Sequence, residues 1–106
     1  MAPPPILLRI PAHLRGKLLS LSVQDHYVEI VTSRGKHLAL MQLGDAIKET
    51  SGIEGMQIHR SHWVAISGIK SVRKANGKAI VRTLSGKELP VSRTYLPALV
   101  DAGLLL

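Results

Sequence analysis

Two short segments of the chain each join an arginine to a serine at the end of an apolar, strand-like run. They read Ile58-His59-Arg60-Ser61 and Leu89-Pro90-Val91-Ser92-Arg93. An arginine projects a planar fork of donors that matches the edge of a guanine base or a phosphate group. On a stiff β scaffold such a fork suits a nucleic-acid surface better than a buried core. The chemistry that these residue types favour is therefore binding, not catalysis.

The positive charge of the chain is concentrated around the same two segments. The 106 residues carry a formal net charge of +7. Between His59 and Arg93 there are eight lysines and arginines against the single carboxylate of Glu88, so the whole excess lies there. A field of this kind attracts polyanions. The alternative is a solvated face that only aids solubility. A phospholipid surface is disfavoured because no basic amphipathic helix is visible.

The composition narrows the class of protein. A chain of 106 residues supports one domain with a modest core. Cysteine is absent, which excludes disulfides and thiolate metal sites. No apolar run approaches the roughly 18 residues of a membrane helix, and the start lacks the features of a signal peptide. Asp25-His26 resembles part of a catalytic dyad, but no serine or cysteine elbow accompanies it, so we expect no enzyme and no cofactor.

The chain is expected to consist of a short leading segment and one β-rich domain. Residues 1–16 are interpreted as a linker or truncated N-terminal segment, because four prolines should break any regular element. The domain is predicted over residues 17–106. Alternating apolar residues and short β-branched runs predict strands, with Asn76-Gly77 as the strongest hairpin signal. The strands are expected at 19–23, 27–32, 37–41, 56–59, 63–66, 69–74, 78–84 and 87–91.

Two short helices complete the expected architecture. Leu43, Ala46, Ile47 and Thr50 recur at helical spacing, and Gly52 is placed to end that helix. A final helix is expected after Thr94, which could cap it, with Gly103 at its end. The chain is thus predicted to be mainly β with two small helices and no internal repeat.

Three motifs in order suggest a family. Asp25-His26 lies between two predicted strands, and the Ile-His-Arg-Ser and Leu-Pro-Val-Ser-Arg blocks follow. In this combination the chain resembles LytTR-type DNA-binding domains from about Lys17 to Gly103. The resemblance implies an elongated fold of about ten short strands with two short helices. It also implies the output domain of a bacterial, cytoplasmic transcription regulator. Such domains insert loops into successive major grooves of double-stranded DNA and are often joined to a receiver or a membrane sensor.

The resemblance also implies roles for individual residues. The base-reading positions of the family fall on His26, Arg60 and Arg93. Arginine can bond guanine O6 and N7 together, whereas histidine offers one donor or acceptor. The side chains expected to hold phosphates and set the register are Ser61, Arg73, Lys74, Asn76, Lys78 and Ser92. Because no coiled-coil heptad is present, we expect a monomer that meets a second copy on repeated DNA half-sites about one helical turn apart.

The chain departs from the family pattern directly after the Ile58-His59-Arg60-Ser61 block. It has His62-Trp63-Val64-Ala65 where relatives usually have Tyr-Leu-Val-Asn. The change at Ala65 removes a polar group, and Trp63 is larger than the usual aliphatic residue, so the local packing must differ. On an apolar strand, Trp63 is expected in the core and not stacked on a base.

Several of these residues also have purely structural interpretations. Arg60 could form an ion pair with Glu88 or Glu54, and Arg93 could simply mark the start of the last helix. His59 is expected to be a core or inter-strand histidine. His59 and His62 are not expected to bind a metal, because a spacing of three in one strand points them to opposite faces and no cysteine or carboxylate pair completes a site.

Two other binding functions remain open. One is a β module for RNA or single strands, although such modules usually stack bases on several exposed aromatics, and this chain has three aromatic residues in all. The other is an interaction domain that binds an acidic protein partner through the basic face.

Overall fold

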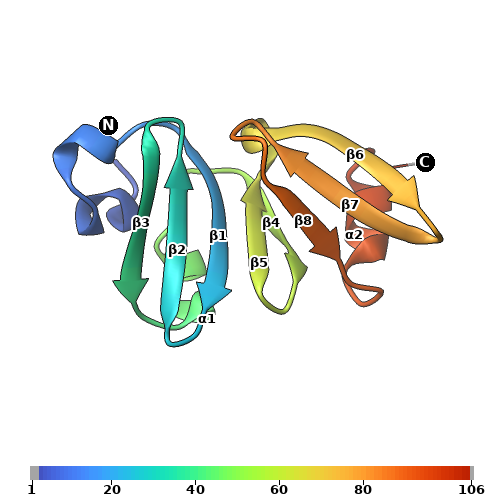
Figure 1. The fold of residues 1–106 in the computed structure, drawn as a ribbon, viewed down its shortest axis with the longest axis horizontal. Helices are drawn as coiled ribbons and strands as arrows, with labels where there is room; N and C mark the ends of the chain where they lie inside the picture. The colour runs from blue at the N-terminus through green and yellow to red at the C-terminus, as the bar shows by residue number, and fades with distance from the viewer. Residues whose placement is uncertain (1–2, 106) are drawn as a thin grey trace.

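The protein consists of two antiparallel sheets that lie side by side along an elongated molecule (Figure 1). The computed structural model describes residues 3–105, with principal extents of 39 × 28 × 22 Å. The first sheet has the strand order β3-β2-β1-β5-β4, and the second has the order β6-β7-β8. The bounds of the first sheet are β1 (Leu18–Gln24), β2 (Tyr27–Thr32), β3 (Gly35–Leu40), β4 (Gly55–His59) and β5 (His62–Ala65). Those of the second are β6 (Ile69–Ala75), β7 (Lys78–Thr83) and β8 (Glu88–Val91).

Two short helices accompany the sheets, α1 (Leu43–Lys48) and α2 (Leu96–Asp101), and a 3-10 turn (Ile66–Gly68) links the sheets. The prediction of a mainly β chain with two short helices is confirmed, with eight strands in the described residues against about ten expected. The predicted cap by Thr94 was wrong. Tyr95 occupies the N-cap of α2, and no side chain bonds there. In the described part of the chain, no helix is both long and apolar enough to span a membrane.

Tight turns set the register of the hairpins. Ala75 pairs with Lys78, so Asn76 and Gly77 form a two-residue turn. Their φ angles of 54° and 75° are the left-handed values that this kind of turn requires. Gln24 pairs with Tyr27 around a second such turn, where Asp25 has a φ of 54°. Asparagine, aspartate and glycine tolerate this conformation better than other residues, which explains why the chain reverses at these positions.

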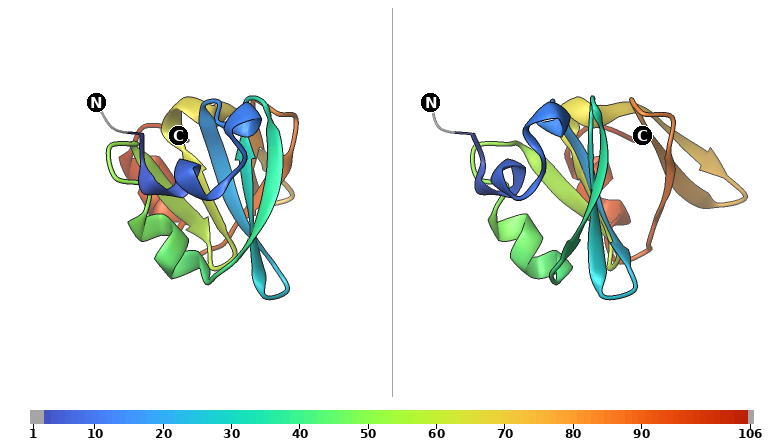
Figure 2. Two further views of the ribbon diagram at one scale, coloured as in Figure 1. Left: turned by 90° about the vertical axis from the view of Figure 1, so that its left-hand side faces the viewer. Right: turned by 60° about the vertical axis from the view of Figure 1, so that its left-hand side comes forward.

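The buried side chains form two clusters on opposite sides of the β4–β5 hairpin. The first cluster fills the space between the first sheet, α1 and the N-terminal segment, which lie together on one side of that sheet (Figure 2). The second cluster joins the hairpin to the second sheet and α2. Trp63 of β5 belongs to the first cluster, whereas Ile58 and Val64 belong to the second. The hairpin therefore connects the two halves of the molecule.

Trp63 is accommodated by a glycine on the neighbouring strand. The indole is 3% exposed, which confirms that it belongs to the core. A Cβ added at Gly55 would lie 2.1 Å from Trp63 Cζ2, far inside van der Waals contact. Ala65, which pairs with Gly55, is fully buried as well. The departure from the family pattern is therefore a packing arrangement in which a large ring fills the space above a residue without a side chain.

The N-terminal segment is packed onto the first sheet. It forms two 3-10 helices, η1 (Pro5–Arg9) and η2 (Ala12–Leu14), so the expectation that the prolines would break any regular element was wrong. Proline fits the first turn of a helix, where its missing N–H is not needed. Ile6, Leu7 and Ile10 are buried in the first cluster. A domain boundary near residue 16 stays a prediction.

An ion pair and a backbone bond fasten this segment to the end of α1. Arg9 donates two hydrogen bonds to the carboxylate of Glu49, at 2.6 and 2.7 Å. The N–H of Ile6 donates to the carbonyl oxygen of Glu49 at 3.1 Å. The pairing with Arg9 lowers the pKa of Glu49. The segment thus makes specific polar contacts with the sheet domain as well as apolar ones.

Candidate nucleic-acid interface

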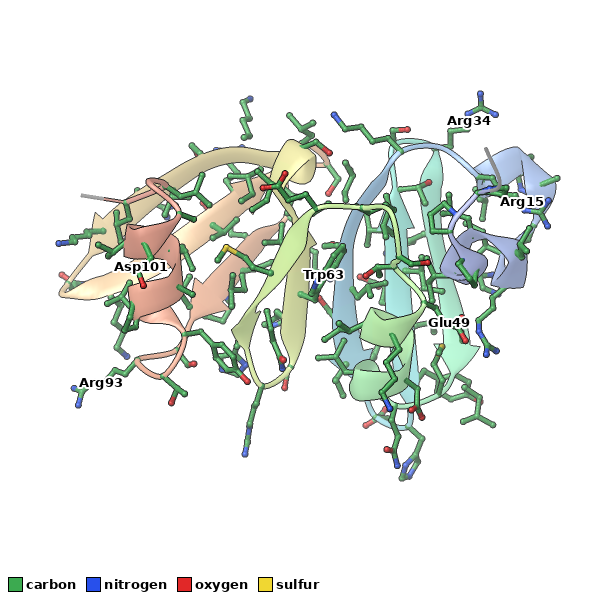
Figure 3. The ribbon with its side chains drawn as sticks, turned by 180° about the vertical axis from the view of Figure 1, so that it is seen from behind. Arg15, Arg34, Glu49, Trp63, Arg93 and Asp101 are labelled. Carbon is green, nitrogen blue, oxygen red and sulfur yellow. The ribbon has the colours of Figure 1, made fainter. Side chains whose placement is uncertain are left out.

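Three connections lie at the same end of the molecule, and each carries one of the predicted base-reading residues. The β1–β2 turn, the β4–β5 turn and the β8–α2 connection all occupy the lower edge in Figure 1. They contain His26, Arg60 and Arg93, whose side chains are all exposed. Arg93 points away from the body of the protein (Figure 3). The fold therefore places on one edge three residues that are far apart in the sequence.

Backbone hydrogen bonds tie these three connections together. The N–H of Val23, near the end of β1, donates to the carbonyl oxygen of Ser61 at 2.8 Å. The N–H of Ser92, just after β8, donates to the carbonyl oxygen of Ile58 at 2.9 Å. The Arg60 turn is thus attached to the His26 turn on one side and to the Arg93 connection on the other. The three form a continuous row with a fixed order.

The β4–β5 turn is also braced from within. The N–H of Ser61 donates to His59 Nδ1 at 3.1 Å, and Gln57 Nε2 donates to the carbonyl oxygen of His59 at 3.1 Å. When the imidazole of His59 is neutral, its proton therefore resides on Nε2. Arg60 projects from a turn whose backbone is held in place. Little backbone entropy is therefore lost when Arg60 binds a ligand.

His59 and His62 lie on the same face of the hairpin, contrary to the expectation from their spacing. They are direct cross-strand partners, and their ring centroids are 5.3 Å apart. Arg60 and Ser61 reverse the chain between them, so the alternation rule for a single strand does not apply. Residues 3–105 contain no group of three potential ligands arranged to hold a metal ion.

His62 lies in a half-buried position between the sheets. Its Nδ1 is 2.8 Å from the hydroxyl oxygen of Ser22 on β1. Burial, together with the nearby His59 and Lys87, lowers the pKa of His62 to about 4. At neutral pH the imidazole of His62 is therefore uncharged, and it acts as a hydrogen-bonding part of the scaffold behind the Arg60 turn.

A hollow of about 440 Å³ lies next to the Arg93 connection. It separates the β6–β7 turn from the start of α2, and its polar lining consists of His59, Asn76, Lys78, Ser92 and Arg93. Three predicted phosphate-binding residues thus adjoin one predicted base-reading residue. His59, which was expected to be a core or inter-strand histidine, is a cross-strand partner of His62 and also borders the same hollow. Its place at the end of a predicted strand, directly before Arg60, was the signal in the sequence that it could adjoin the site.

The other predicted phosphate-binding residues lie elsewhere. Ser61 is in the β4–β5 turn itself, whereas Arg73 and Lys74 are on β6. Arg73 Nη1 donates to Glu88 Oε2 at 2.7 Å. Glu88 is therefore the partner of Arg73 and not of Arg60. Among residues 3–105, no ion pair includes Arg60 or Arg93, and the structural interpretation of Arg60 as a salt-bridge residue finds no support.

Comparisons with known proteins identify the family and the fold. The family model described as the LytTr DNA-binding domain matches residues 16–103. A solved LytTr DNA-binding domain comes from Bacillus cereus, from a protein described as a methyl-accepting/DNA response regulator. It superimposes with a TM-score of 0.70 at 17% identity and covers 80% of this chain and 79% of its own. The curated protein sequences gave no match. The chain belongs to the LytTR family of DNA-binding domains.

Proposed function

We propose that this domain binds double-stranded DNA in a sequence-specific manner and is the output domain of a bacterial transcription regulator. The observation that carries the proposal is the row of three tethered connections that expose His26, Arg60 and Arg93 at one edge. Arg60 and Arg93 read guanine edges through two hydrogen bonds each, and His26 contributes a single bond. The row enters the major groove with loops, without a recognition helix.

The dimensions of the molecule suit this mode of binding. Its longest extent is 39 Å, slightly more than the roughly 34 Å of one turn of B-DNA. One domain can therefore cover about one turn of a duplex. The Arg60 turn lies between the His26 turn and the Arg93 connection, so it faces the middle of the site.

Phosphate contacts set the register of the protein on the duplex. The hollow beside Arg93 presents the amide of Asn76, the ammonium group of Lys78 and the hydroxyl of Ser92, all suited to anionic oxygens. Ser61 and Lys74 hold the backbone at other points. Arg73 contributes less, because Glu88 already neutralises part of its charge.

The proposal extends to the assembly on DNA. One domain binds one half-site, and two copies occupy repeated half-sites about one helical turn apart. The domain is monomeric in the absence of DNA, and a receiver or a membrane sensor in the full regulator controls it from the cytoplasmic side. Sedimentation at micromolar concentration with and without duplex tests this assembly. A tight dimer in the absence of DNA contradicts it.

A binding experiment separates this function from its two alternatives. Duplexes obtained by in vitro selection are compared with random duplex, single-stranded DNA, RNA and an acidic polypeptide over a series of salt concentrations. Selected duplex should bind most tightly, and log affinity should fall with log salt by about 0.9 for each phosphate neutralised, with about five to eight such contacts. Preferential binding of single strands, or affinity that does not depend on salt, contradicts the proposal.

A further inference from the structure

An ion pair connects the two sheets at a point away from the β4–β5 hairpin. Lys87, immediately before β8, bonds Glu29 in the middle of β2. The other ion pairs among the described residues lie within one half of the molecule, Arg9–Glu49 in the first and Arg73–Glu88 in the second. Glu29 and Lys87 therefore form the one charged link between the sheets in this part of the chain.

Both partners of this pair are firmly held by their own sheets. Glu29 lies between β1 and β3, opposite Ser22 on one side and Leu38 on the other. The carbonyl oxygen of Lys87 accepts the N–H of Thr83 at 2.9 Å, which closes the β7–β8 turn. The side chain of Glu29 is only 12% exposed. Loss of this ion pair can therefore alter the position of the two sheets relative to each other.

Packing does not fix the separation of the sheets at this point. A hollow of about 640 Å³ lies between β2, β3 and the β7–β8 turn, and Glu29 and Lys87 line it together with Lys36 and Ser85. The apolar contact between the two halves runs through the β4–β5 hairpin and the second cluster instead. Gly68 of the 3-10 turn also lies close against the backbone of Leu19 on β1. The sheets therefore meet along one packed seam, formed by the hairpin and this turn, and the ion pair spans the hollow beside it.

We propose that Glu29 and Lys87 are positioning residues for DNA recognition. Their ion pair holds the angle between the two sheets, and that angle sets the distance from the His26 turn on the first sheet to the Arg93 connection on the second. Rotation about the packed seam would move these two connections apart or together along the duplex. This inference rests on the proposed function, because it concerns the spacing of the base-reading residues on their site.

The test measures spacing preference on DNA. Base pairs are inserted or deleted between the part of a selected site read by the His26 turn and the part read by the Arg93 connection. Each insertion shifts one part by one base-pair step, so the wild-type domain should lose about tenfold or more in affinity at the wrong spacing. Glu29→Gln should reduce this discrimination to about threefold or less. It should also bind random duplex slightly more tightly, because a negative charge is lost.

A charge exchange distinguishes geometry from net charge. Lys87→Gln should flatten the spacing preference as Glu29→Gln does, but with weaker binding to random duplex. The double variant Glu29→Lys with Lys87→Glu keeps the net charge and can re-form the pair, so it should recover most of the discrimination. The melting temperature of each variant shows whether the fold is retained.

The Arg9–Glu49 pair supplies the control, because it is another arrangement of one cation and one glutamate but lies wholly within the first half. Glu49→Gln should leave the spacing preference unchanged. If the wild-type domain shows no selected site, or no spacing preference, the proposed function and its mode of binding fail first. If the wild type discriminates and both Glu29→Gln and Lys87→Gln discriminate equally well, the positioning role is overturned and the proposed function stands.

Discussion

The two halves of this domain differ in what their side chains contribute. The first sheet is covered by α1 and the N-terminal segment. Together they contribute the eleven buried residues of the first cluster, whereas the second cluster has five. The part of the chain after Ala65 carries seven lysines and arginines against two carboxylates, and the part before Ile66 carries seven against five. The first half therefore supplies most of the apolar burial, and the second supplies most of the charge excess.

The β4–β5 hairpin contributes to both halves and also carries Arg60. A change in this hairpin can therefore alter stability, recognition or both, depending on which way the side chain points. A substitution that changes stability without changing DNA binding, or the reverse, shows that the two roles of the hairpin depend on different side chains. Four predictions follow this division, beginning with the change that should cost most.

Gly55→Ala should be strongly destabilising. Its methyl group would overlap the indole of Trp63, and overpacking of this kind costs about 3 kcal/mol when the ring cannot move away. Urea unfolding gives the free energy directly. The double variant Gly55→Ala with Trp63→Leu should recover part of the loss, because the smaller side chain vacates the space. A single variant as stable as the wild type would contradict the packing described for the first half.

Arg60→Ala should lower affinity for the selected site by about 2 kcal/mol, with little effect on random duplex, because guanine reading depends on base identity. Arg93→Ala should cost about as much on the selected site and also weaken random binding, because Arg93 borders the hollow that presents Lys78. His26→Ala should cost less than either, since imidazole makes one bond. Competition binding measures all three.

Two controls accompany the arginine substitutions. Thermal melting should show that the variants stay folded, since these side chains are exposed. Arg60→Lys keeps the charge but loses the two-pronged bond, so it should resemble Arg60→Ala on the selected site. If Arg60→Ala weakens selected and random duplex equally, Arg60 is a phosphate contact and the sequence is read by other residues.

Acidification should destabilise the hairpin through His62. The pKa of His62 is about 4 in the folded protein, against about 6.5 in an unfolded chain. The unfolded state therefore binds more protons between these values, and the free energy of unfolding should fall as the pH drops from about 6.5 towards 4. Because the ring is only half-buried and water screens it, we expect a loss of about 1 kcal/mol. His62→Gln should flatten this pH dependence, while His13→Gln, an exposed change in η2, should not.

Lys78→Ala should have the smallest effect. It should weaken all duplexes alike, by less than about 1 kcal/mol at physiological salt, and should reduce the slope of log affinity against log salt by about 0.9. Lys17→Ala is the matched control, because Lys17 is exposed immediately before β1, at the end opposite to the row of connections. If Lys78→Ala leaves this slope unchanged, Lys78 and the hollow that it lines do not contact the DNA.

The features that could be predicted from the sequence are those encoded locally. Asn76-Gly77 forms the expected turn because both residues tolerate positive φ, and alternating apolar residues marked the strands. The His26, Arg60 and Arg93 positions came from family motifs, and the fold placed their connections at one edge. Their roles on DNA stay predictions.

The features that could not be predicted depend on contacts between distant residues. Ile6 and Ile10 lie in a proline-rich segment that was interpreted as a linker, and their burial is decided by α1 and the first sheet. His59 and His62 share a face only because a turn separates them. Glu29 and Lys87 are 58 residues apart, and nothing in either local sequence indicates their pairing.

The two backbone bonds that tether the Arg60 turn have a consequence for how such a domain diverges. A residue inserted into the Arg60 turn or the Arg93 connection would displace the group that its neighbour uses, the carbonyl of Ser61 or the N–H of Ser92. If these side chains read bases as proposed, new target sequences would be reached by exchanging the residues at positions 26, 60 and 93, while the lengths of the Arg60 turn and the Arg93 connection stay constant. Natural variants with altered specificity should differ by substitutions at these positions and not by gaps.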